Sequence, residues 1–183
     1  NNAALILVGD IDHETPMTKA RQYFGSIPRR PDPPRVTAIE PPMTEPRRVE
    51  IPDIAPSPRV VHAYHAPSAR DRGDIAMDLL SRILSTGQSS RLYRHLDQDK
   101  EIAVSTSGSN WSFEQAGLFS LSVILKPDVS IEQGEAALKE EIQVLLEKGI
   151  ALEELEKVRF LAIAEKVREG ETVQGRADQL GYA

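Results

Sequence analysis

Residues 118–125 read Leu-Phe-Ser-Leu-Ser-Val-Ile-Leu, so that Phe119 and Leu121 are each followed by a serine. Successive side chains of a β-strand point to opposite faces, and this alternation is typical of an antiparallel strand that buries one face. A second strand-like stretch, Ile102–Trp111, precedes it, and Ser112–Gly117 lies between the two as the predicted turn. The pattern predicts an antiparallel sheet with one face in a core.

Helices and two more strands are predicted around this pair. Ser130 and Gln133 have the spacing of a capping box, which marks the start of a helix. Apolar residues at helical spacing predict helices from Asp71 to Gly87, from Ser89 or Ser90 through Leu96, from Ser130 to Gly149, from Leu152 to Val167, and from Gly170 to the end of the chain. The further strands are Arg47–Asp53 and Ser57–Ala66. Strands followed by helices predict the α+β class, an antiparallel sheet with helices packed on one face.

The N-terminal part of the sequence differs from this main body. The apolar run Ala3–Val8 predicts a strand, and a helix is predicted from Thr15 to Gly25. Seven prolines then fall within residues 28–46. Proline removes a backbone donor and fixes φ, so these residues predict an extended linker. We read the start of the sequence as a cut through a longer protein, and expect the orphan strand to fold back on its own sheet or to pair with another molecule in a homodimer.

Composition excludes several classes of function. The chain has 183 residues and a net charge of -6, so it repels phosphate backbones and is not expected to bind nucleic acid. It contains no cysteine, which excludes disulfides, thiolate metal sites and cysteine nucleophiles and leaves the compartment open. No apolar run has the length of a membrane span.

Four stretches, in this order, resemble zinc peptidases of the insulinase- and pitrilysin-like M16 family. The most specific is Gly-Gln-Ser-Ser-Arg-Leu-Tyr after an amphipathic helix. The resemblance covers nearly the whole chain, through Asn1–Asp12 with Tyr23–Pro28, the proline-rich bridge, Ala76–Tyr93, and Lys148–Ile150 with Leu155–Val158.

The resemblance implies a domain organisation and a cofactor. Such proteins consist of two related α+β halves that close on a peptide, and one half carries zinc on a His-x-x-Glu-His motif. Residues 1–28 then correspond to the last strand and helix of the first half, residues 29–46 to the linker, and residues 47–183 to a truncated non-catalytic second half. Zinc is expected in the missing catalytic half and no cofactor in this fragment. The resemblance also makes the bacterial periplasm one candidate location.

The histidines do not form a zinc site in the sequence. His13, His62, His65 and His95 lie outside any His-x-x-Glu-His motif. His62 and His65 are three residues apart, which on a strand places them on opposite faces. We therefore predict no metal ligands and no catalytic residues in this chain.

Relatives in the family use an Arg and a Tyr of the second half to hold the substrate carbonyl. Alignment on the Ser-Arg-Leu segment places Asp97 and Val104 at those positions, and neither offers a donor in the form expected. Arg91 and Arg94 are the nearby substrate-side candidates, although Arg91 has an equally good interpretation as a cap on neighbouring carbonyls.

Other residues with chemical potential have plainer interpretations. The pairs Glu140-Glu141 and Glu153-Glu154 are predicted to lie on solvated helix faces, because adjacent helical residues point about 100° apart. Trp111 is expected to cover the core, with substrate stacking as the alternative.

The sequence therefore leads to one function and to alternatives. The first is the non-catalytic region of a zinc metalloprotease, which shapes a chamber for peptide or unfolded polypeptide and works with a catalytic half on the same chain. The second is a scaffold subunit, or inactive peptide-binding homologue, whose catalytic half is a separate chain. The third is an unrelated α+β binding module, which helices on both faces of a parallel sheet would indicate.

Overall fold

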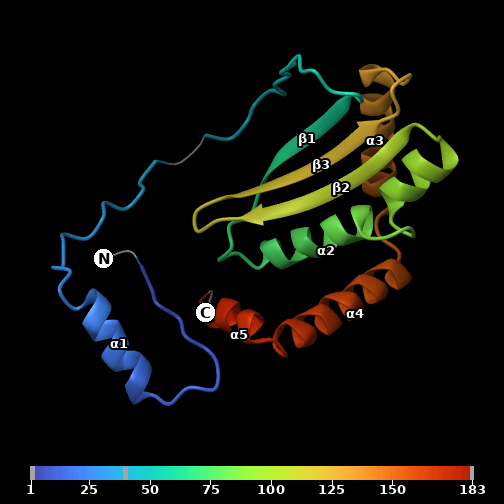
Figure 1. Cartoon of the computed structure of the whole chain (residues 1–183). Helices are drawn as coiled ribbons and strands as arrows, with labels where there is room; N and C mark the ends of the chain where they lie inside the picture. Colours follow the sequence, from blue (N-terminus) through green and yellow to red (C-terminus); the bar gives the residue numbers. More distant parts are fainter. Residues whose placement is uncertain (1–2, 39–40, 182–183) are drawn as a thin grey trace. The chain divides into compact units, whose positions relative to one another are not determined.

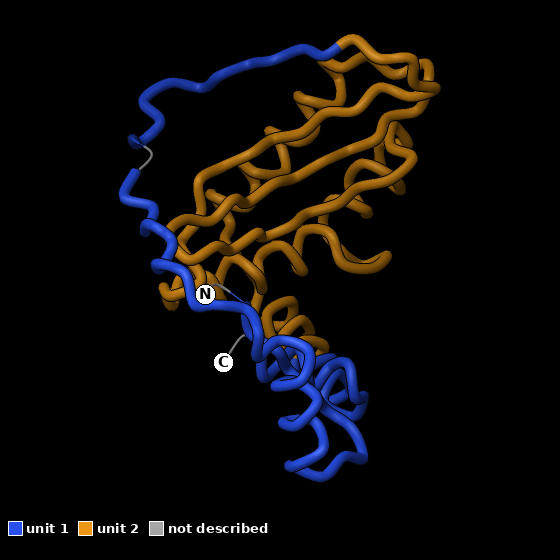
Figure 2. Tube along the Cα trace, turned by 60° about the vertical axis from the view of Figure 1, so that its left-hand side comes forward, with its two compact units in different colours: residues 1–51, 163–183 blue, residues 52–162 orange. Residues whose placement is uncertain are grey.

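The computed structural model describes residues 3–38 and 41–181. The chain separates into two compact units, of which unit 1 comprises residues 1–51 and 163–183 and unit 2 comprises residues 52–162 (Figure 2). Predicted features at Asn1 and Asn2, at linker residues 39 and 40, and at the last two residues lie outside the described part of the chain.

Unit 2 is built on a three-stranded antiparallel sheet (Figure 1). Its strands are β1 (Arg59–Ala66), β2 (Ala103–Ser112) and β3 (Gly117–Leu125), in the order β1-β3-β2. The predicted antiparallel sheet is confirmed, and the alternating stretch that predicts it is the central strand. Because β3 is paired on both sides, β1 and β2 each leave one edge of the sheet.

The predicted strand Arg47–Asp53 is wrong. These residues contain neither strand nor helix, and the side chains of Val49 and Ile51 are 79% and 83% exposed. Pro46 precedes the segment and Pro52 lies within it, and proline cannot donate to a sheet ladder. Apolar character at alternate positions is therefore not sufficient to place this segment in the sheet.

The helices of unit 2 differ in how they are capped. They are α2 (Gly73–Ser85), the π-helix η1 (Tyr93–Asp99), α3 (Ile131–Lys148) and α4 (Leu152–Glu169), which continues into unit 1. The capping box is present, since Gln133 N donates to Ser130 Oγ at 3.2 Å and Ser130 N to Gln133 Oε1 at 3.1 Å. Gly149, with φ of 70°, ends α3 in the left-handed region that favours glycine.

The predicted short helix after Ser90 is present but differs in type. Its last turns form η1, where Lys100 N donates to His95 O at 3.1 Å across five residues. Glu101 follows with φ of 53°. Among the described residues it is the one non-glycine residue with a positive φ. The tight exit from the π-helix into β2 is thus made by a residue with a β-carbon, at a cost in backbone strain.

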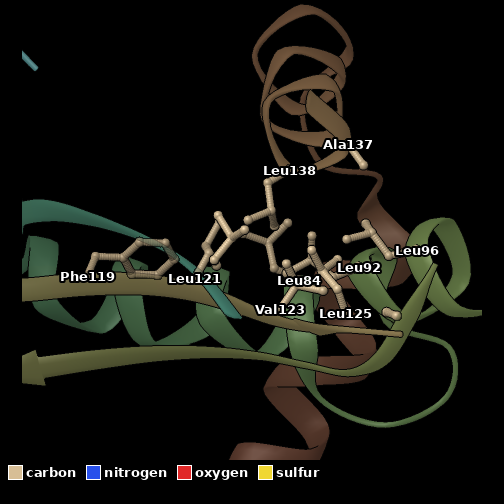
Figure 3. Close-up of a cluster of buried hydrophobic side chains, with 11 residues drawn as sticks. Leu84, Leu92, Leu96, Phe119, Leu121, Val123, Leu125, Ala137 and Leu138 are labelled. Carbon is tan, nitrogen blue, oxygen red and sulfur yellow. The ribbon is translucent and has the colours of Figure 1, made fainter. Parts of the chain in front are cut away.

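The core of unit 2 lies on one side of the sheet. Leu84 of α2 and Leu138 of α3 meet Leu121 and Val123 of β3, as Figure 3 shows. The buried cluster comprises Val60, Leu84, Leu92, Leu96, Ala103, Phe119, Leu121, Val123, Leu125, Ala137 and Leu138. The α+β class with helices against an antiparallel sheet is therefore confirmed.

Unit 1 contains α1 (Glu14–Phe24), the end of α4, and α5 (Val173–Gly181). The predicted strand Ala3–Val8 is wrong in this structure, because no described residue of unit 1 belongs to a strand that could complete a ladder with it. The segment lies beside α1 and the two border an apolar hollow of about 350 Å³, whose lining includes Leu5, Leu7 and Phe24. No described side chain of unit 1 is buried.

Candidate functional site

The side of the sheet away from the core carries small side chains. Along β3 it presents Ser120 and Ser122, and the register places Ala63 of β1 opposite Ser120 and Ser107 of β2 opposite Ser122. Arg59 Nε donates to Ser122 Oγ at 2.8 Å, so one cation also borders this face. Ser122 is only 6% exposed, whereas Ser107 of β2 is exposed, so β2 carries the accessible hydroxyl group of this pair.

Trp111 stands at one end of this surface. It pairs with Leu118 and is 58% exposed, so the expectation that it covers the core is wrong. The reason is the register, which places both residues on the face opposite Phe119 and its core neighbours. An exposed indole beside an exposed leucine is an apolar contact point, and stacking on a bound peptide stays a prediction.

The histidines are dispersed. The register places His62 on the core side of β1, opposite Leu121, and His65 on the other side, opposite Leu118. Burial lowers the pKa of His62, and its Nδ1 lies 3.4 Å from the hydroxyl of Tyr64. His62 is therefore neutral near neutral pH and takes part in an aromatic contact within the edge of the sheet.

Arg91 is held by groups of the protein itself. Its Nε and Nη2 donate to the two carboxylate oxygens of Glu154 at 2.8 and 2.7 Å, and Nη2 also donates to Gly149 O at 2.8 Å. Its Nη1 lies 3.9 Å from Glu141 Oε1. This two-pronged arrangement joins the start of the η1 region to the turn between α3 and α4. The geometry fits the structural interpretation of Arg91.

The two carboxylates beside Arg91 have pKa shifts of opposite sign. The hydrogen bond from Arg91 lowers the pKa of Glu154. Burial raises the pKa of Glu141, against the opposing effect of His95 and Arg91. The expectation that Glu141 lies on a solvated face is wrong, since it is 7% exposed. Arg91 and Glu154 therefore form the closer ion pair, and Glu141 is a buried carboxyl beside it.

The other candidate positions lie on or near η1. Arg94 is exposed, and its charge helps to lower the pKa of Glu154. The carboxylate of Asp97 accepts a hydrogen bond from Tyr93, which raises the pKa of that phenol. Val104 is the extra residue of a bulge in β2 and is 57% exposed. A substrate role for Arg91 or Arg94 stays a prediction.

Sequence reasoning missed Glu154 as the partner of Arg91. The two residues are 63 positions apart, so no local spacing connects them. A weaker signal does exist, because Glu154 Oε2 also accepts from Ala151 N at 3.0 Å at the start of α4. Glutamate near a helix start is typical of such a cap, whereas its long-range partner depends on the fold.

A sequence profile described as the peptidase M16 inactive domain matches residues 1–161 of this chain. The chain belongs to the peptidase M16 family, in its inactive-domain branch. Among residues 3–38 and 41–181, no group of three or more His, Asp or Glu side chains lies close enough together to hold a metal ion.

Relatives of this M16 domain include zinc proteases. The chain is 28% identical over 170 residues to the zinc protease PqqE of Helicobacter pylori, an alignment that covers 87% of this chain and 36% of that protein. The chain thus spans about a third of the length of this curated relative.

Solved structures share the fold. A protease from Helicobacter pylori superposes with a TM-score of 0.75 at 21% identity, over 93% of this chain and 42% of that chain. The inactive peptidase domain of a Bordetella parapertussis protein gives a TM-score of 0.63 at 25% identity, over 69% of each chain. In the described part of this M16 domain, no helix combines the length and the apolar character needed to cross a bilayer.

Proposed function

We propose that this M16 domain forms one wall of a peptide-binding chamber, and that a second half of the parent protein holds zinc and performs the hydrolysis. One observation carries the proposal: an inactive-domain match on a sheet whose face away from the core bears serine side chains and an exposed indole. Such a surface offers hydroxyl groups to a peptide and an aromatic plane to an apolar side chain.

The side chains at the substrate-holding positions favour a non-catalytic role for this chain. The positions that hold the substrate carbonyl in resembling proteases are here Asp97 and Val104. Asp97 accepts a hydrogen bond from Tyr93 and Val104 has no polar side-chain atom. Arg94 is the exposed donor of this region and is the residue we propose to face substrate.

The test compares the chain alone with the chain joined to its upstream half. Zinc content is measured by atomic emission, and hydrolysis of a quenched fluorescent peptide is measured with and without a chelator. We expect stoichiometric zinc and chelator-sensitive hydrolysis in the longer protein, and neither in the 183-residue chain. Chelator-sensitive cleavage by the short chain would end the proposal.

A scaffold subunit that works with a separate catalytic chain is the second candidate. The absence of an Arg and a Tyr at positions 97 and 104 favours it, since such a subunit has no need to contact the scissile carbonyl. It predicts that hydrolysis appears on mixing this chain with a zinc-bearing M16 chain. A single gene that encodes both halves and is active alone would favour the first candidate instead.

A further inference from the structure

One cation of the sheet has no acidic partner among the residues that the structure describes. Arg59 is exposed at the start of β1, and its Nε donates to Ser122 Oγ of β3 at 2.8 Å. No carboxylate of a described residue forms an ion pair with it. The N–H groups on the two Nη atoms of a guanidinium are further donors. The bond to Ser122 therefore holds the guanidinium beside β3, with the Nη donors available to an acidic group of another molecule.

The strands around Arg59 carry no negative charge. The chain has 28 Asp and Glu residues and a net charge of -6, yet no acidic residue lies in β1, β2 or β3. A ligand on the side of the sheet away from the core meets serine hydroxyl groups and a guanidinium, and no carboxylate of the strands. The sheet therefore has the opposite charge to the chain as a whole, and this favours an acidic ligand over a basic one.

The second contact point on this side of the sheet is the apolar pair Leu118 and Trp111. The two residues lie opposite each other in the β2-β3 ladder and are 42% and 58% exposed. Leu118 and Ser122 are four residues apart on one strand, which is a separation of about 13 Å. The row between them has only small side chains, those of Ala63, Ser120 and Ser109. An apolar contact and a cation thus lie at a defined spacing along β3.

We propose that Trp111 and Arg59 select peptide segments in which a large apolar residue and an acidic side chain are four residues apart. This inference rests on the chamber function proposed above and adds the class of peptide that the wall recognises. In an extended peptide, residues four apart point to the same side and are about 13 Å apart, which matches the spacing along β3. The apolar side chain packs on Trp111 and Leu118, and the carboxylate accepts from the Nη atoms of Arg59.

The two contacts differ in what they contribute to selection. Packing on Trp111 depends on apolar area and is insensitive to salt, whereas the contact with exposed Arg59 is screened by salt. The peptide residue midway between the two lies over the row of small side chains, so its size has little influence. We therefore expect the preference for the acidic residue to decrease as the salt concentration rises, and the preference for the apolar residue to persist.

The first experiment uses the fluorescence of Trp111, which is the single tryptophan of the 183-residue chain. The probe is a peptide blocked at both ends, with phenylalanine at its centre, glutamate four residues away on each side, and threonine elsewhere. The control has the same composition with each glutamate three residues away, on the opposite side of an extended chain. We expect the probe to shift the emission to shorter wavelength in a saturable way, and the control to bind about fivefold more weakly.

Matched variants assign the carboxylate contact to Arg59. Arg59→Gln removes the charge and Arg59→Lys retains it, whereas Arg82→Gln removes the same charge from α2, which packs on the core side. We expect Arg59→Gln to bind the probe about fivefold more weakly, and to bind a probe with glutamine in place of glutamate equally well. Arg59→Lys should lose part of the affinity and Arg82→Gln none. If circular dichroism shows that Arg59→Gln does not fold, the peptide series on the parent chain still decides.

The apolar contact is tested at Trp111 by calorimetry, since this substitution removes the fluorophore. We expect Trp111→Ala to bind the probe about tenfold more weakly, and Trp111→Phe to recover most of that loss because it keeps an aromatic ring. Substitution of alanine for the phenylalanine of the probe should then have no further effect on Trp111→Ala. A merely structural role of Trp111 would leave the two substitutions additive.

Four results overturn the inference. They are an emission of Trp111 that the probe does not shift, equal binding of the probe and its control, unaltered binding by folded Arg59→Gln, and an emission shift that depends on protein concentration without any peptide. The last would show that a second copy covers this side of the sheet. Failure of the chamber function is distinguishable, because the protein joined to its upstream half would then hydrolyse no peptide while the emission of Trp111 still followed the peptide series.

Discussion

Two apolar segments of this chain have opposite fates. Phe119, Leu121 and Val123 in β3 are at most 4% exposed, whereas Leu5 and Leu7 are 58% and 50% exposed. The second segment is the more uniformly apolar of the two in sequence. Burial therefore follows from neighbours: β3 has a strand on each side and two helices on one face, and Ala3–Val8 has no strand partner. An apolar run can be buried only where the rest of the fold provides neighbouring strands or helices to cover it.

The largest expected effect lies in the buried segment. Leu121→Ala removes a side chain that is 1% exposed and packed between α2, α3 and the sheet. We expect a loss of about 2–5 kcal/mol in the free energy of unfolding, because both transfer energy and a cavity contribute. Urea denaturation followed by far-UV circular dichroism measures it. A loss below about 1 kcal/mol would show that this core is not close-packed.

The ion pair that joins distant parts of unit 2 gives the next effect. Arg91→Ala leaves Glu154 and the carbonyl of Gly149 without their shared partner. We expect a loss of about 1–3 kcal/mol in the free energy of unfolding, discounted toward the lower end because Glu154 is partly exposed. Arg91→Lys is the matched control and should recover part of it, since lysine keeps the charge and loses the fork. Equal stability of Arg91→Ala and the parent chain would show that Arg91 has no structural role.

The parts of the fold that depend on local pattern follow from sequence. The alternation in residues 118–125 and the capping box at Ser130 specify a strand and a helix start through interactions within a few residues. Arg47–Asp53 and Ala3–Val8 have equally suggestive patterns and form no strand, because a strand is completed only by a partner. The π-helical form of η1 also has no local signature in the sequence.

The candidate site was predictable only in outline. The family resemblance rests on the Gly-Gln-Ser-Ser-Arg-Leu-Tyr segment, which the sequence contains in full. The pairing of Arg91 with Glu154 and the exposure of Trp111 depend on register and on contacts across tens of residues.

The carboxyls beside Arg91 predict a pH dependence with two signs. Burial raises the pKa of Glu141 above its ordinary 4.5, so the stability from its neutral form is present below that value and is lost as the pH rises through the raised pKa. Arg91 lowers the pKa of Glu154, so its contribution is present above 4.5 and is lost as the pH falls through the lowered pKa.

Two glutamine variants separate these contributions. Relative to the parent chain, Glu141→Gln should gain stability as the pH rises from 4.5 to neutral, and Glu154→Gln should be less stable at neutral pH with a difference that shrinks in acid. Thermal unfolding across that pH range measures both, and we expect smaller effects than for Arg91→Ala. The same sign for both variants would contradict the assignment.

A gain of stability is expected where the backbone is strained. Glu101 has φ of 53°, and Glu101→Gly relieves the cost of a β-carbon in the left-handed region. Glycine increases the entropy of the unfolded chain, and this opposes part of the gain. We therefore expect a net gain of about 0.5–1 kcal/mol in the free energy of unfolding. Glu101→Ala is the control and should show no gain, because it keeps the β-carbon. Chemical denaturation of the three proteins measures the difference.

The smallest effect is expected at the exposed segment and completes the comparison with β3. Leu7→Ala removes the same atoms as Leu121→Ala, from a side chain that is half exposed. We expect a change within about 0.5 kcal/mol in the free energy of unfolding, because a half-exposed side chain makes few contacts in the folded chain that its truncation could remove. The same urea titration serves both variants, so the ratio of their effects is measured directly. A loss at Leu7 approaching that at Leu121 would mean that Ala3–Val8 has found a partner in solution, and that the difference between the two segments does not hold there.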